Sequence, residues 1–270
     1  MATVGAVYTV DRYERTAQQV VAALFRDEAE KSKDRPRPQH KRVWASLPQD
    51  DGTLSGQKAV FTWLDWELRL RNPDQKKEAV YLCDGQETLW QDVQAKLPDR
   101  NAVQILDLLH VTPRLWKAAH VFHAEKSKEV ETFVRQRLLR VLQGKADGVI
   151  RGLREMATKR GLTGSKKKAI REICGYLRKN LQRMRYDEYL AAGYPIASGV
   201  IEGACRHLVK DRMERAGMHW TAAGAQAMLD LRSVFISGQW EEYQSQWIEW
   251  ETQRLYPHRE VAEPTFNMAS

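Results

Sequence analysis

The sequence has 270 residues, a formal net charge of +8 and a pI near 9.4. Its 43% of hydrophobic residues can build a sizeable core in one large or two small domains. Cys83, Cys174 and Cys205 are too few and too far apart for a disulfide framework or a zinc site of usual spacing. No apolar run approaches the roughly 18 residues that span a bilayer, and the first residues lack a signal-peptide pattern. We therefore expect a cytoplasmic protein without membrane contact and with a polyanionic partner.

The first part of the chain alternates between strand and helix patterns. Residues 2–10 are β-branched and alternating, which predicts a strand. Thr16 opens a capping-box sequence ahead of an apolar helical face. Residues 26–42 are charged and proline-rich, which predicts a surface loop. A short strand over 43–47 and a helix over 56–71 are expected next.

A strand–helix–strand passage follows. The apolar runs 79–83 and 102–106 predict buried strands, and 86–97 predicts a helix between them. Connections of this length build parallel sheets, and ligands lie beyond the carboxyl ends of such strands. Asp84 and Asp107 directly follow the two runs, so we expect them to meet at that edge. Each acid could instead cap a loop or the following helix.

The basic residues are concentrated in one block. From Arg114 to Arg185 the chain has twenty Lys and Arg residues against six Asp and Glu residues, a local net charge of +14. The other residues therefore sum to −6. The block is helical in pattern throughout, and its apolar stripes predict a core. The run Lys166, Lys167 and Lys168 is either a phosphate-binding element or simply a solvated face.

The stretch from residue 193 to 210 combines a glycine-built turn with the start of a helix. Ser198 can cap that helix, and Glu202 falls in its first turn, where the helix dipole favours a carboxylate. Glu202 is then either a metal-binding acid beside a polyanion or the partner of Arg206 in an i, i+4 ion pair. The other basic residues that follow are His207, Lys210, Arg212 and Arg215.

The last segment predicts an amphipathic helix after a helix over 221–235. Trp240, Tyr243, Trp247 and Trp250 follow one another at spacings of three, four and three residues. We expect this aromatic stripe to dock on the body of the protein or on a partner subunit, rather than to stack on nucleotide bases.

Asp84, Asp107 and Glu202 need a common explanation. Carboxylates that converge at a sheet edge among cations suit two-metal phosphoryl transfer, in which two Mg²⁺ ions stand roughly 3.5–4 Å apart. Hard oxygen ligands suit Mg²⁺, and Mn²⁺ is the alternative ion. The residues alone make this reading plausible without making it specific.

Three motifs carry a resemblance to a known family. The segment 193–207, Gly-Tyr-Pro-Ile-Ala-Ser-Gly-Val-Ile-Glu-Gly-Ala-Cys-Arg-His, continuing to Trp220, resembles the C-terminal signature of bacterial insertion-sequence transposases. These are ISKra-type transposases of the Asp-Asp-Glu class. Residues 82–85 and 105–110 resemble their earlier motifs, in the same order. The resemblance implies an RNase H-like fold in which a helical insertion separates the second Asp strand from the Glu helix.

The resemblance also implies roles for individual residues. Asp84 corresponds to the second catalytic Asp and Glu202 to the Glu, and both would bind metal. Asp107 and His110 correspond to an Asp-x-x-His motif beside the active site, resembling that of Mutator-like and hAT-type transposases, and both are expected among the catalytic residues. Asp107 is the alternative to Asp84 as the direct metal ligand. DNA contacts are expected from the cations of the Glu helix and of the insertion: Arg206, His207, Lys210, Arg212, Arg215, Lys166, Lys167 and Lys168.

One departure from the family concerns its first catalytic Asp, which has no convincing copy here. Asp11 is the only substitute to propose, and its position fits a hairpin end better. We therefore expect a C-terminal portion of a transposase in four segments. These are an incomplete RNase H-like sheet (1–113), a basic insertion (114–190), the Glu helix with its successor (191–236) and an aromatic helix with a tail (237–270).

Three functions follow as expectations. The first is a DNA transposase whose metal-dependent phosphodiester cleavage and strand transfer are impaired in this chain. The second is a non-catalytic, nucleoid-associated DNA-binding remnant or regulator, which pairs with full-length transposase or with another copy through the aromatic helix. The third is a helical nucleic-acid-binding protein without nuclease ancestry, which would lack a parallel sheet carrying Asp84 and Asp107.

Overall fold

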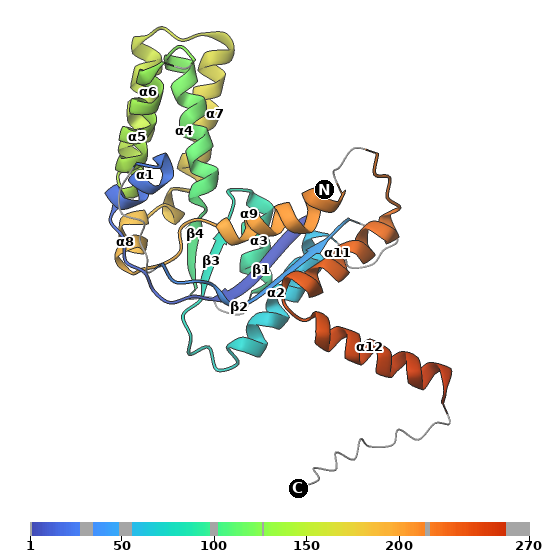
Figure 1. Ribbon diagram of the computed structural model, residues 1–270. Coiled ribbons are helices and arrows are strands. Elements are labelled where there is room, and N and C mark those ends of the chain that lie inside the picture. The colour runs from blue at the N-terminus through green and yellow to red at the C-terminus, as the bar shows by residue number, and fades with distance from the viewer. Residues whose placement is uncertain are drawn as a thin grey trace.

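The computed structural model describes residues 2–27, 35–48, 56–97, 102–125, 127–213 and 217–257, the side chain of Arg212 excepted. These residues form an α/β structure in which helices predominate over two small sheets. An upright bundle of helices rises from a body that holds both sheets, so that the two parts form an L (Figure 1). The mixed α/β class predicted from the sequence is confirmed.

The first sheet pairs β1 (Thr3–Thr9) with β2 (Gln39–Ser46) in antiparallel orientation. Between them lies α1 (Ala17–Phe25), where the Thr16 side chain accepts a hydrogen bond from the N–H of Gln19 in a capping box. The predicted first strand and helix are thus confirmed. The loop predicted to reach residue 42 is wrong in its last part, because pairing with β1 extends β2 back into a polar stretch. Residues 28–34 of that loop lie outside the described part.

Helix α2 (Gln57–Arg71) packs on this sheet, as predicted. Gly5 of β1 allows the close approach, because a Cβ there would lie 2.8 Å from Val60. The buried Glu67 forms an ion pair with Arg42 of β2, at 2.8 Å. Packing and this ion pair together hold α2 against both strands.

The second sheet pairs β3 (Val80–Cys83) with β4 (Val103–Leu106) in parallel, and α3 (Glu87–Lys96) connects them. The predicted strand–helix–strand passage is therefore confirmed. Its core also includes Phe61 of α2, so α2 packs on both sheets. The buried members of this cluster are Phe61, Tyr81, Trp90, Val93 and Leu97.

The upright bundle, called the arm below, consists of α4 (Leu108–Phe122), α5 (Lys128–Leu142), α6 (Ala146–Lys159) and α7 (Gly164–Lys179). The apolar stripes predicted for this region form its core, for example at Leu138, Ile173 and Leu177. Helical structure was expected only from Arg114. It begins earlier because Asp107 caps α4, which continues through Pro113. The boundary expected after residue 113 thus falls inside a helix.

After the arm the chain returns to the sheets. The short η1 (Leu181–Arg183) and α8 (Tyr186–Ala191) lead to α9 (Gly199–Ala204). The helix then continues as a π-helix, η2 (Cys205–Lys210), and ends in α10 (Asp211–Met213). The fully buried Tyr186 donates a hydrogen bond from its hydroxyl to the carbonyl of Leu106, at 2.7 Å, which ties α8 to β4.

Two helices complete the described chain. Gln226 of α11 (Ala222–Ile236) exchanges hydrogen bonds with the backbone at Ala45 and Leu47, at 3.1 and 2.9 Å. The following α12 (Trp240–Leu255) extends away from the body, and none of its residues is buried (Figure 1). Of the aromatic stripe, Trp240 contacts Phe235 of α11. The prediction that the stripe docks on the body is wrong for its other members in the described chain, and docking on a partner stays a prediction.

The described residues settle two further points. None of the described helices has both the length and the apolar character needed to cross a lipid bilayer. In the described part of the chain, β1 and β3 each have a hydrogen-bonded neighbour strand on one side only. Both sheets therefore have an open edge.

Candidate functional site

The carboxyl ends of β3 and β4 bring Asp84 and Asp107 to one edge of the sheet. Cys83 lies opposite Leu106 in the parallel register, so Asp84 and Asp107 are the next residues of neighbouring strands. The N–H of Asp107 also donates to the carbonyl of Cys83 at 2.9 Å, which extends the pairing by one residue. The predicted meeting of these two acids is confirmed.

Asp107 is buried, with 1% of its surface exposed, and its carboxylate is hydrogen-bonded within the protein. Oδ1 accepts from the N–H of Leu109 at 2.9 Å and from the N–H of Ser198 at 3.3 Å. Oδ2 accepts from the hydroxyl of Ser198. Asp107 thus caps α4 and ties the start of α9 to the sheet edge. The alternative predicted for this acid, capping of the next helix, is confirmed.

Asp84 is half-buried and has a more local role. Its Oδ1 accepts a hydrogen bond from the N–H of Gln86 at 2.7 Å, in the turn that leads into α3. The alternative of a loop-capping acid is therefore confirmed here too. Burial raises the pKa of the neighbouring Cys83 thiol to about 12, and the charge of Asp84 adds to the effect. Cys83 consequently stays protonated at neutral pH.

Gly85 allows the arm to pack on the Asp84 turn. A Cβ at this position would overlap the ring of Tyr176 in α7. Arg114 of α4 stacks on the same ring, with its guanidinium carbon 3.3 Å from the ring centroid. Two arm helices therefore meet the turn beside Asp84, and this contact helps to fix the arm relative to the sheet edge.

Gly85→Ala is expected to lower the free energy of unfolding by about 1–3 kcal/mol, because the added methyl group must displace the Tyr176 ring. Urea unfolding measures the change. Gly203→Ala is the matched control, since a Cβ there meets no heavy atom within 4 Å and alanine favours the helix. Equal stability of the Gly85→Ala variant and the parent chain would contradict this account of the contact.

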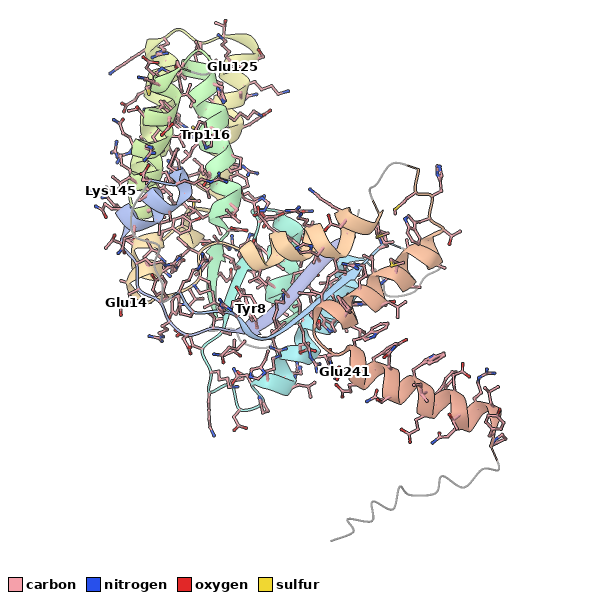
Figure 2. All side chains as sticks on the ribbon, viewed as in Figure 1. Tyr8, Glu14, Trp116, Glu125, Lys145 and Glu241 are labelled. Carbon is pink, nitrogen blue, oxygen red and sulfur yellow. The ribbon has the colours of Figure 1, made fainter. Side chains whose placement is uncertain are left out.

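Glu202 is exposed on α9 and lines a groove that extends along α4 to Glu125. One face of α4 supplies most of the lining, including Trp116, which Figure 2 labels on the arm. Asp84 and Asp107 do not line this groove. Its lining residues are Leu24, Leu109, Thr112, Pro113, Trp116, Lys117, His120, Glu125 and Glu202.

The basic residues after Glu202 face a different acid from the one expected. Arg206 Nε lies 4.0 Å from Oδ1 of Asp211, and His207 Nδ1 lies 3.0 Å from Oδ2 of the same residue. In the described chain Arg206 makes no ion pair with Glu202, so that alternative is wrong. Lys210 is exposed and has no acidic partner among the described residues. Only the backbone of Arg212 is described, and Arg215 lies outside the described residues.

His110 is exposed, one turn into α4. The backbone N–H of His110 donates to the backbone carbonyl of Asp107 at 3.0 Å, as expected in the first turn after a cap. Its ring makes no hydrogen bond to Asp107, whose oxygens are directed at Leu109 and Ser198. The backbones of His110 and Asp107 are therefore hydrogen-bonded, but their side chains are not.

The cations of the arm form an exposed positive surface. Lys166, Lys167 and Lys168 are all exposed in the first turn of α7, at the end of the arm farthest from the sheets (Figure 1). Within the described part of the chain, only Lys168 of the three has an acid near it: its Nζ lies 4.0 Å from a carboxylate oxygen of Glu172. Several other exposed cations from α4 to α7 have no acidic partner in the described part: Lys117, Lys128, Arg140, Lys145, Lys159 and Arg171.

The described residues do not fit a two-metal centre. Such a centre needs several hard ligands that face one point. Among the described side chains no group of three or more His, Cys, Asp or Glu residues has that arrangement. Both oxygens of Asp107 are hydrogen-bonded internally, and Glu202 faces a groove that Asp84 does not line. We therefore assign no metal-dependent step to these residues.

Two contacts made by residues 193–210 could not be predicted from the neighbouring sequence. Ser198, expected to cap α9, makes no capping hydrogen bond and instead binds Asp107, 91 residues away in the chain. Gly193 has φ +74°, and a Cβ there would lie 2.7 Å from the backbone nitrogen of Tyr13. Long-range packing therefore explains Ser198 and Gly193, which the sequence predicted to act only in the local turn and helix start.

Comparisons with protein-family models, with curated proteins and with solved structures found no match to this chain. Its function has to be inferred from its own residues and their arrangement.

Proposed function

We propose that this chain is a DNA-binding protein derived from an ISKra-type transposase of the Asp-Asp-Glu class, with an incomplete catalytic centre. The observation that carries the proposal is the Asp107–Ser198 contact. It starts the Glu202 helix at the carboxyl edge of the parallel strands that end in Asp84 and Asp107. The basic arm lies between β4 and that helix in the chain, as the resemblance implies. This parallel pair supports nuclease ancestry over an unrelated helical protein.

An RNase H-like core with a central strand outside the described residues would account for the divided sheet. The chain supplies an antiparallel pair, a helix and then a parallel pair, and α2 packs on β1 through Val60 and on β3 through Phe61. The open edges of β1 and β3 leave each pair without a second neighbour in the described chain. A strand between them, carrying the family's first Asp, would join the two pairs into one sheet.

The arm is the DNA-binding element in this proposal. Exposed Lys and Arg side chains without acidic partners bind phosphates and release counterions, independently of base sequence. The groove that Glu202 lines adds Lys117 and His120 of α4. A duplex held there would lie against α4 and α9 together.

Binding without cleavage is the expected activity of this chain. A pair of Mg²⁺ or Mn²⁺ ions would need further oxygen ligands besides Asp84 and Glu202, because ligand number and charge set affinity for hard cations. The protein would then act as a DNA-binding remnant or as a regulator that pairs with full-length transposase. A nucleoid-associated location in a bacterial cytoplasm follows from that role.

The test combines a binding assay and a cleavage assay on the full chain. Fluorescence anisotropy should show binding to labelled duplex DNA that weakens steeply with salt. With Mg²⁺ or Mn²⁺, cleavage should not exceed that of the Glu202→Gln variant. Glu125→Gln is the matched control, because Glu125 lines the same groove and has no counterpart in the resembling motifs. Cleavage abolished by Glu202→Gln and kept by Glu125→Gln would show that the catalytic centre is functional.

A further inference from the structure

We propose that α12 is a dimerisation helix that pairs, antiparallel, with α12 of a second copy of this chain. Every residue from 241 to 250 is exposed. Exposed fractions are 37% for Tyr243, 51% for Trp247 and 58% for Trp250. Monomeric proteins rarely leave so many large apolar side chains in contact with water on one helix.

The start of α12 is fixed to the body while the rest projects from it. The ring of Trp240 contacts Phe235 of α11, with the centroids 6.3 Å apart, and contacts Tyr243 at 6.0 Å. Beyond this contact the helix runs away from the body (Figure 1), from the residue labelled Glu241 in Figure 2. Its distal apolar residues are therefore presented on a defined helix.

The spacing of the aromatic residues matches a two-heptad seam. Trp240, Tyr243, Trp247 and Trp250 occupy alternating a and d positions, and Arg254 occupies the next a position. The residues that flank such a seam decide which partner it accepts. In α12 they are mostly uncharged: Gln244, Gln246, Glu251 and Gln253.

The charge distribution favours a second α12 over a basic partner. The other acids of the helix, Glu241, Glu242 and Glu249, lie at b and c positions, away from the flanks of the seam. Two copies can therefore meet along their aromatic residues with little repulsion between like charges. A cationic partner would be matched by acids along the flanks, where glutamines stand instead.

Antiparallel pairing is the orientation that suits the ends of the helix. Acids are found in its first turn, at Glu241 and Glu242, and Arg254 is in its last turn. An antiparallel partner brings Arg254 of one copy beside the acidic first turn of the other. It also places the positive end of each helix dipole beside the negative end of the other.

The area available fits a reversible dimer. An aromatic side chain can bury 150–250 Å². Covering the exposed parts of this stripe would remove on the order of 500 Å² per copy, about 1,000 Å² in total, which is near the lower limit for a specific interface. The dimer should therefore dissociate on dilution.

Sedimentation velocity over a concentration series of the full chain tests the proposal. The parent chain should show a monomer–dimer equilibrium that persists in high salt. Trp247→Glu with Trp250→Glu should raise the dimer dissociation constant by about 100-fold or more. Two controls should leave it unchanged. Ser245→Glu with Thr252→Glu adds the same charge at the outward f positions, and Trp66→Glu changes another exposed tryptophan, on α2.

The body should stay folded in these variants, since no residue of α12 is buried, and circular dichroism with thermal unfolding checks this. A parent chain that is monomeric at all concentrations would overturn the proposal. An equal loss of dimer in either control would do the same. A dimer that dissociates in high salt would point to docking of the acidic helix on the arm of the other copy, and would also overturn it.

Discussion

Asp107→Ala is expected to lower the free energy of unfolding by about 3 kcal/mol or more. The substitution removes the cap of α4 and leaves the N–H groups of Leu109 and Ser198 and the Ser198 hydroxyl without an acceptor. A lost helix cap costs about 1 kcal/mol, and each buried donor left unpaired costs about 1–3 kcal/mol. Urea unfolding of the full chain measures the loss.

Two further variants separate the parts of this contact. Asp107→Asn keeps one carbonyl oxygen for the backbone donors, so it should cost only about 1 kcal/mol. Ser198→Ala removes the hydroxyl that donates to Asp107, and its effect should not add in full to that of Asp107→Ala, because both substitutions break this hydrogen bond. Full additivity in this double-mutant cycle would mean that Asp107 and Ser198 act independently.

Asp84→Ala is the matched control, since Asp84 ends the neighbouring strand and is only half-buried. Among the described residues its side chain accepts a hydrogen bond from the N–H of Gln86, so its loss should cost about 1 kcal/mol. If Asp107→Ala left stability unchanged and abolished DNA binding, Asp107 would act on the ligand and not on the fold. The comparison therefore distinguishes a structural carboxylate from a functional one.

The sheet edge could be predicted from the sequence because its signals are local. Two short apolar runs separated by a helical period predict parallel strands, and the residue after each run then lies at the shared edge. Asp84 and Asp107 were placed together on that basis, and the register confirms it. The same reasoning left open whether these acids cap backbone groups or bind ligands, because burial and donors are set by distant segments.

The contacts that decide between those roles are long-range. Ser198 reaches Asp107 from 91 residues away, and nothing near either residue indicates it. The residue pattern predicts helix only from Arg114, yet α4 begins at Leu108 and continues through Pro113, because the cap at Asp107 comes earlier. For α12 the period predicted the helix, which the structure has at Trp240–Leu255, but periodicity does not identify what covers its aromatic stripe.

Removing lysines from the basic arm is expected to have a large effect on DNA binding. Lys166→Ala, Lys167→Ala and Lys168→Ala together should weaken binding to duplex DNA roughly 100-fold at low salt. They should also reduce the slope of log affinity against log salt by up to about 3, since each phosphate contact contributes about 0.9. Stability should hardly change, because all three side chains are exposed. Anisotropy titrations at several salt concentrations give both quantities.

A charge-matched control decides whether position or net charge matters. Lys58, Lys76 and Lys77 are also exposed and lie outside the 114–185 block, so replacing all three with alanine removes the same charge from the body. Binding through the arm predicts a small effect for this control, because screening limits the reach of surface charges to about 10 Å. Equal weakening by both triple variants would mean that DNA responds only to total charge. Lys166 to Lys168 would then be the solvated face that their sequence equally allows.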